Sequence, residues 1–190
     1  MSKNIADKLG KGISPDDFIN GMTVNQDKLK DWYERFSWDE EKRAALVNLK
    51  EKLNVRAAIL AADWCGDVVR NLPVVLHVLK ELGIETEIFI MEQHLDLMDQ
   101  FRTMGGRSIP KVIFTDPEGN VLADWGPRPA YIQEPMVRFK QENPDPNAPD
   151  YDEKKTAAYE EIHRRYGKGT EYQQLIVDEL YQLFSKLAAA

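Results

Sequence analysis

The chain contains one residue that could act as a strong nucleophile, a lone cysteine among 190 residues. Cys65 stands in the stretch Trp-Cys-Gly-Asp-Val, residues 64–68. A short, mostly apolar run at 55–61 precedes it and an apolar helical pattern follows, so Cys65 falls where a strand ends and a helix begins. Free backbone N–H groups and the positive end of the helix dipole favour a thiolate there. The pattern predicts a nucleophilic thiol that has no internal disulfide partner.

Charged neighbours act on this thiol in opposite directions. Asp63 and Asp67 would raise the pKa of Cys65 if they are ionised and close, whereas Arg70, one turn into the helix, would lower it. The sequence contains no distances with which to weigh these charges. Two interpretations therefore stay open: Cys65 is used in redox chemistry, or it is an unreactive thiol retained in the loop.

Other residues that could do chemistry form no convincing group. The three histidines are His77, His94 and His163. They are far apart, and none pairs with Cys65 at a familiar metal-ligand spacing. The alternation of Asp63, Cys65 and Asp67 would mix hard and soft ligands on one tight turn, which makes a poor metal cage. We expect no metal ion and no bound cofactor.

The elements that must position Cys65 follow from hydrophobic periodicity. Strands are expected at 55–61, 84–91, 111–114 and 121–125, and helices from the cysteine motif to residue 82, at 94–104 and at 131–141. The order is β-α-β-α-β-β-α. A right-handed crossover makes the first two strands parallel, and a turn at 116–120 adds an antiparallel hairpin. This order predicts an α/β fold with a mixed four-stranded sheet and helices on both faces.

Helical extensions are expected at both ends of this domain. The chain divides into an N-terminal helical extension at 1–53, the α/β domain at 54–141, and a linker with C-terminal helices at 142–190. Residues 1–13 are interpreted as a loose arm, and three helices should begin near Ser14, Asn25 and Ser37. After a proline-rich link, helices are expected at 152–166 and 170–187. These last helices would pack on the domain, or alternatively build an oligomer interface.

Composition limits the classes of partner. The chain is 43% hydrophobic and 30% charged with a net charge of −7, as in an ordinary globular protein. Nucleic acids and anionic membranes select basic surfaces, so neither is expected as a main partner. No apolar stretch resembles a signal peptide or a membrane span, and one cysteine implies no oxidising compartment. We expect a cytoplasmic protein.

Two motifs in this order resemble a known family. Trp64-Cys65-Gly66, with Pro73 in the following helix, is similar to the thioredoxin motif Trp-Cys-Gly-Pro-Cys and its helix proline. Arg107-Ser108-Ile109-Pro110 looks like the cis-proline loop that faces the active-site cysteine in thioredoxin-like folds, and Gly126 matches a glycine found there. The resemblance implies a thioredoxin-like fold and a cis bond before Pro110. The alternative is a trans proline that starts a strand.

The sequence also departs from the thioredoxin pattern. Val68 occupies the place of the second, resolving cysteine, Asp67 replaces the usual proline, and Ile59 stands where thioredoxins carry a buried acid. In the dithiol mechanism a second thiol breaks the mixed disulfide, and Val68 has no thiol to do this. The chain is closer to a bacterial-type subgroup with Trp-Cys-Gly-Asp and a small apolar residue. For that subgroup the resemblance implies a fold without a settled reaction.

The function predicted from these features is a monothiol redox role, as thiol–disulfide exchange or as oxidation sensing. Cys65 would be the catalytic nucleophile, and the substrate-binding residues would be Trp64, Gly66, Asp67, Val68, Ile109 and Pro110. The partner would be a protein or peptide thiol or disulfide, with a low-molecular-weight thiol as co-substrate. The alternative is a binding module that holds a peptide without turnover. A third hypothesis is a structural role of the terminal helices, and the oligomeric state is left open.

Overall fold

The computed structural model describes residues 3–190, and a four-stranded sheet organises them. The strands are β1 Arg56–Ala61, β2 Glu85–Ile90, β3 Lys111–Thr115 and β4 Val121–Trp125. Their spatial order is β2-β1-β3-β4. β1 pairs with β2 in parallel, whereas β3 is antiparallel to both β1 and β4. The predicted mixed α/β sheet is confirmed.

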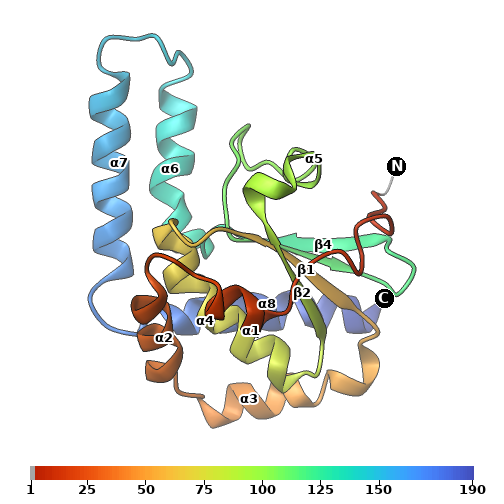
Figure 1. The fold of residues 1–190 in the computed structure, drawn as a ribbon. Helices are drawn as coiled ribbons and strands as arrows, with labels where there is room; N and C mark the ends of the chain where they lie inside the picture. The colour runs from red at the N-terminus through yellow and green to blue at the C-terminus, as the bar shows by residue number, and fades with distance from the viewer. Residues whose placement is uncertain (1–2) are drawn as a thin grey trace.

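Helices precede, separate and follow these strands (Figure 1). They are α1 Pro15–Asn20, α2 Gln26–Arg35, α3 Glu40–Val47, α4 Gly66–Glu81, α5 Leu95–Met98, α6 Ala130–Glu142, α7 Tyr151–Tyr166 and α8 Tyr172–Ala189, with short 3₁₀ turns at Lys50–Lys52 and Met91–Gln93. Ser14 caps α1 by accepting a hydrogen bond from the Asp17 N–H, as its position before Pro15 predicts. Gly83, with φ of +65°, follows the end of α4.

The core forms around β1 and α4. Five of the six residues of β1 are buried, because this strand is flanked by β2 and β3 and covered by helices. α8 packs against α4 and reaches β4, and its Phe184 ring lies 5.1 Å from Phe114 of β3, centroid to centroid. The C-terminal helix therefore completes the same hydrophobic core as the sheet. The cysteine loop thus stands between two well-packed elements.

The described part of the N-terminal segment is attached to the body, which corrects the expectation of a loose arm at 1–13. Ile5 is fully buried, and its N–H donates to the Gly119 carbonyl oxygen. The Val121 N–H donates to the carbonyl oxygen of Lys3. Burial of the apolar Ile5 side chain stabilises this attachment. The polar composition of residues 1–13 did not indicate it. Residues 1–2 lie outside the described part.

Two other local expectations were wrong. The helix expected at 94–104 is limited to α5, which ends at Met98. The chain beyond it forms turns, with positive φ at Met104 and Gly105. The third helix begins later than predicted: Asp39, rather than Ser37, accepts the capping hydrogen bonds from Glu41 and Lys42. Asp39 has two acceptor oxygens directly before the helix, so it competes well for the free N–H groups.

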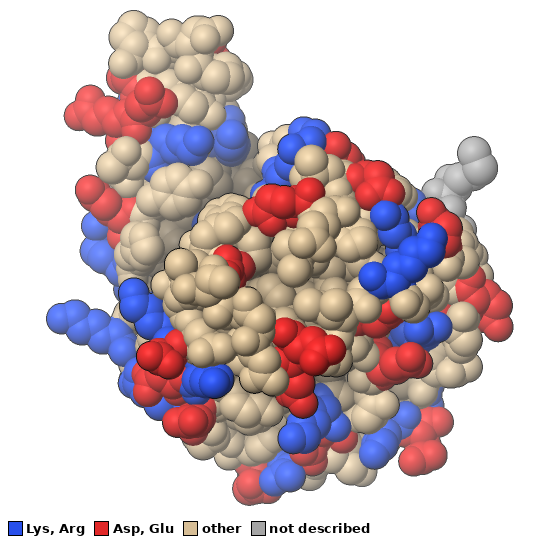
Figure 2. All heavy atoms as spheres, in the orientation of Figure 1, with Lys and Arg blue, Asp and Glu red and all other residues tan. Residues whose placement is uncertain are grey.

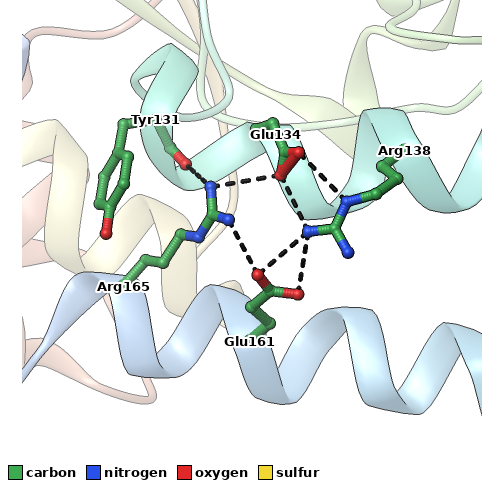
Figure 3. Close-up of polar contacts among 5 residues, drawn as sticks. All are labelled: Tyr131, Glu134, Arg138, Glu161 and Arg165. Atoms are coloured by element: carbon green, nitrogen blue, oxygen red, sulfur yellow. Dashed lines mark hydrogen bonds and ion pairs between the residues drawn. The ribbon is translucent and has the colours of Figure 1, made fainter.

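Helices α6 and α7 form a two-helix hairpin that projects from the body (Figure 1). The proline-rich link at 143–150 joins them, and the Phe139 and Tyr151 rings pack 4.9 Å apart near the distal end. Four charged residues bridge the helices on one side: Glu134, Arg138, Glu161 and Arg165 (Figure 3). The base of the hairpin meets the beginning of α4, so the hairpin lies beside the cysteine.

Candidate functional site

Cys65 is the N-cap residue of α4, four residues beyond the end of β1. Its thiol donates a hydrogen bond to the backbone carbonyl of Ile109, with 3.5 Å between Sγ and O. The peptide bond between Ile109 and Pro110 is cis. The side chain of Cys65 is half-buried. The fold thus brings the cysteine motif against a proline loop that is 44 residues away in the chain.

Gly126 has a steric reason to be glycine. Its φ is +118°, in the region that side chains disfavour, and a Cβ there would collide with the Pro110 carbonyl oxygen. The end of β4 therefore presses directly on the loop that faces Cys65. Gly126 therefore allows the close approach that fixes the proline loop of the site.

A groove of about 730 Å³ opens beside the thiol. Its walls come from α2, the cysteine loop, the loop before β3 and α7, so both terminal extensions help to build it. Five of the predicted site residues line it: Trp64, Cys65, Gly66, Asp67 and Ile109. Val68 and Pro110 are buried and lie outside its lining.

A buried polar network lies next to the cysteine. Asp67 accepts two hydrogen bonds from the Arg128 guanidinium, at 2.7 and 2.9 Å, and a third from the Tyr166 hydroxyl at 2.7 Å. The Asn71 amide donates to the Tyr166 hydroxyl at 2.7 Å and to the Pro127 carbonyl at 2.9 Å. The network ties the first two turns of α4 to the base of the α6–α7 hairpin.

Arg128, Tyr166 and Asn71 were not predicted as site residues from the sequence. Arg128 and Tyr166 are 61 and 99 residues from Asp67, so no local spacing connects them. One signal was present: a carboxylate at the start of an apolar helix needs a counter-charge when the helix is buried. Which cation supplies it depends on the fold.

The environment of Cys65 raises the pKa of its thiol. Burial is the largest cause, because a thiolate loses hydration there. Backbone N–H groups of Val68 and Asp67 at the helix start act in the opposite direction, as the sequence predicted, but burial outweighs them. The Asp67 charge raises the pKa further, and the Arg128 charge partly offsets it. At neutral pH the thiol form therefore dominates.

The predicted counter-charge was assigned to the wrong arginine, and Asp63 also acts elsewhere. Arg70 lies in an aromatic cage and donates to the Gly167 carbonyl at 2.8 Å. The cage consists of the Trp32, Tyr166 and Tyr172 rings, whose centroids lie 4.5–4.8 Å from its guanidinium carbon. Asp63 accepts hydrogen bonds from the N–H and hydroxyl of Thr23, which lower its own pKa.

The histidines take separate positions. The His77 ring stacks on the Tyr33 and Phe36 rings, and burial lowers its pKa. His94 packs edge-on against Phe89, whereas His163 lines the groove. Within residues 3–190, no three His, Cys, Asp or Glu side chains form a group that could hold a metal ion. No helix in the described chain is long and apolar enough to cross a membrane.

The sheet has the strand order β2-β1-β3-β4, and Cys65 faces the loop that contains Pro110. These two features define a thioredoxin-like α/β domain. The chain belongs to the thioredoxin-like family: the family model described as Thioredoxin matches residues 12–151, which include the N-terminal helices.

Two solved structures share the fold across their whole length. A protein of unknown function from Pseudomonas aeruginosa is 16% identical with a TM-score of 0.66, covering 99% of each chain. An HIV epitope scaffold is 15% identical with a TM-score of 0.59, covering 97% of this chain and 99% of its own. At these identities the likeness concerns the fold alone. None of the curated proteins compared with the chain matches it.

Proposed function

We propose that the protein is a monothiol thioredoxin-like protein that exchanges disulfides through Cys65. The observation that carries the proposal is the position of Sγ, which lies 3.5 Å from the Ile109 carbonyl at the edge of a substrate-sized groove. A disulfide held in this groove would lie within reach of the sulfur. The substrate class proposed is a protein or peptide disulfide.

The reaction has two balanced steps. The Cys65 thiolate attacks one sulfur of a partner disulfide, so a Cys65–S–S–partner bond forms and the other sulfur leaves as a thiolate. A low-molecular-weight thiol then attacks the partner sulfur of this mixed disulfide, which regenerates the Cys65 thiol and forms a disulfide between the small thiol and the partner. With a glutathionylated peptide, the sulfur that Cys65 attacks is that of glutathione, so the peptide leaves as a free thiolate and the second step forms oxidised glutathione. Val68 carries no thiol for an internal second attack, so the protein itself undergoes no net oxidation.

The raised pKa of Cys65 favours a second candidate function, a peptide-binding module that performs no turnover. A thiol above its usual pKa of about 8.5 is a slow nucleophile at neutral pH. Under this alternative the groove binds its partner, and Cys65 serves as a packing residue on the groove wall.

One experiment separates the two candidates. The full chain is mixed with a glutathionylated peptide and excess reduced glutathione, and release of free peptide is followed with Cys65→Ser as control. Exchange is supported if the wild type releases free peptide, the Cys65→Ser variant does not, and the release is faster at higher pH. Equal rates for wild type and variant, together with retained peptide binding, would leave only the binding module.

A gain-of-function variant tests the role assigned to position 68. Val68→Cys restores a second thiol three residues after Cys65, where the resembled motif has its resolving cysteine. We expect the wild type to show negligible reduction of insulin disulfides and the variant to acquire it. Robust turnover by the wild type would contradict the monothiol mechanism.

A further inference from the structure

The groove beside Cys65 has a charge opposite to that of the whole chain. The protein carries a net charge of −7. Four Lys or Arg residues line the groove, whereas Asp67 is the single acidic residue in its lining. The four cations are Lys28, Arg70, Arg107 and Arg128. Figure 2 shows the molecule hollowed beside the projecting hairpin, with basic side chains on both sides of the hollow.

Carboxylates within the protein neutralise only part of this charge. Asp67 pairs with Arg128, and Asp99 is shared between Arg107 and Arg102 at 2.8 and 2.9 Å. Lys28 and Arg70 form no ion pair with any carboxylate in the described chain. The groove therefore keeps cations whose counter-charge must come from solvent or from a ligand.

Arg70 is held in place by contacts within the protein. Its guanidinium is held among the Trp32, Tyr166 and Tyr172 rings and by the Gly167 carbonyl. This group is thus immobilised before any ligand arrives. Immobilisation in advance reduces the entropy that binding must cost. A guanidinium also presents several donors in a planar fork that matches a carboxylate.

Exposed aromatic rings complete the groove. Trp64 is 56% exposed and Tyr159 is 40% exposed, and both rings belong to the lining. The Trp64 indole N–H donates to Glu92 at 2.6 Å. Glu92 lies outside the groove lining, so it adds no negative charge to the lining. Aromatic walls with convergent cations suit a chain that offers apolar and acidic groups in turn.

We propose that this groove binds an extended acidic peptide, with Asp or Glu side chains of the partner meeting Lys28 and Arg70 near Cys65. The proposal rests on the proposed function and deepens it by naming the substrate class, a disulfide flanked by acidic residues. A short acidic segment fits a groove of about 730 Å³. A long polyanion would also cross the acidic remainder of the surface, which repels it.

The test uses the full chain carrying Cys65→Ser, so that binding is measured without thiol chemistry. Three labelled peptides of equal length, with Glu, Ser or Lys around a central serine, are titrated by fluorescence anisotropy. The acidic peptide should bind tightest, and its advantage should shrink between about 20 mM and about 200 mM NaCl because salt screens charges. Equal affinities for the three peptides would overturn the proposal.

Substitutions locate the charge effect. Lys28→Gln and Arg70→Gln should each weaken the acidic peptide about two- to fivefold, as expected for single exposed charge pairs. Lys52→Gln, the same charge change before β1 at the far end of the strand from Cys65, should leave affinity unchanged. If Arg70→Gln lowers the melting temperature, its loss of affinity can come from unfolding. The Lys28→Gln variant, at an exposed position, then tests the charge effect. An equal loss in Lys52→Gln would show a non-specific effect and contradict the proposal.

Two further titrations test the choice of an acidic peptide. Oxidised glutathione or an oligothymidine that binds as tightly as the acidic peptide would overturn the peptide assignment. The results distinguish failure of the exchange function from failure of the acidic preference. If Cys65 is unreactive but the acidic peptide still binds tightest, only the exchange function is excluded. Conversely, wild-type exchange at equal rates with acidic and basic disulfide peptides removes only the acidic preference.

Discussion

Two clusters of arginine and carboxylate hold the α6–α7 hairpin, and they differ in burial. At its base, Arg128 and Asp67 are 9% and 18% exposed and share their network with Tyr166. Along its side, Arg138 and Glu134 are 45% and 47% exposed (Figure 3). Both clusters use two-point contacts between guanidinium and carboxylate. The chemistry is the same, but the surroundings differ.

This difference determines how much each cluster matters. Water solvates the exposed charges whether or not they pair, so each exposed pair contributes about 0–1 kcal/mol. A buried charge that loses its partner stays dehydrated and uncompensated, which costs several kcal/mol. Only the buried cluster also acts on the thiol, because the charges of Asp67 and Arg128 shift the pKa of Cys65 in opposite directions. The base of the hairpin therefore couples stability to site chemistry.

Asp67→Asn should give the largest effect. The amide keeps the shape of Asp67 but leaves Arg128 without its counter-charge, so the free energy of unfolding should fall by about 3 kcal/mol. Urea unfolding measures it. The matched variant Arg128→Gln should lose a similar amount, and the double variant less than the sum of both. A loss below about 1 kcal/mol for Asp67→Asn would make the two clusters equivalent.

The same variant should change the thiol. In the wild type the pKa of Cys65 is raised, so the iodoacetamide alkylation rate should climb about tenfold per pH unit through the neutral range. Asp67→Asn removes a charge that raises the pKa and leaves Arg128, which lowers it. The midpoint should therefore move to lower pH, with faster alkylation near pH 7. An unchanged midpoint would separate the network from the thiol.

Tyr166→Phe should give an intermediate effect. It removes the hydroxyl that donates to Asp67 and accepts from Asn71, while both partners keep other hydrogen bonds. We expect a loss of about 1 kcal/mol in unfolding free energy. Thermal unfolding measures this loss, with Tyr159→Phe on the same helix as the control. Equal melting temperatures for wild type and Tyr166→Phe would contradict the role of this hydroxyl.

Glu161→Gln, in the exposed cluster, should give the smallest effect. Glu161 pairs with Arg138 and Arg165 at 3.0 and 2.8 Å, but these side chains remain partly solvated. The loss should stay below about 1 kcal/mol and shrink at high salt. The alkylation profile of Cys65 should not move. A shift of that profile would mean that the hairpin transmits charge changes along its length.

The order of strands and helices along the chain could be predicted from the sequence because periodicity is strong in the central domain. The thioredoxin-like fold could be predicted because the motifs at 64–73 and 107–110 resemble that family. The run before Cys65 became β1, and the apolar helix after it became α4. The prediction was wrong for the helix expected at 94–104, which is limited to α5, because the residue pattern of this short segment fits more than one local structure. It also failed for the N-terminal arm, where Ile5 is buried through contacts with the distant Gly119 turn.

The sequence by itself determined the single thiol, its place at a helix start and the absence of a thiol at position 68, since these are properties of neighbouring residues. Only the tertiary structure decided which cation meets Asp67, how deeply Cys65 is buried and which charges line its groove. Those properties depend on side chains up to 99 residues apart. Burial then decided the direction of the pKa shift, which the sequence had left open, because dehydration of a thiolate outweighs the N–H groups at a helix start.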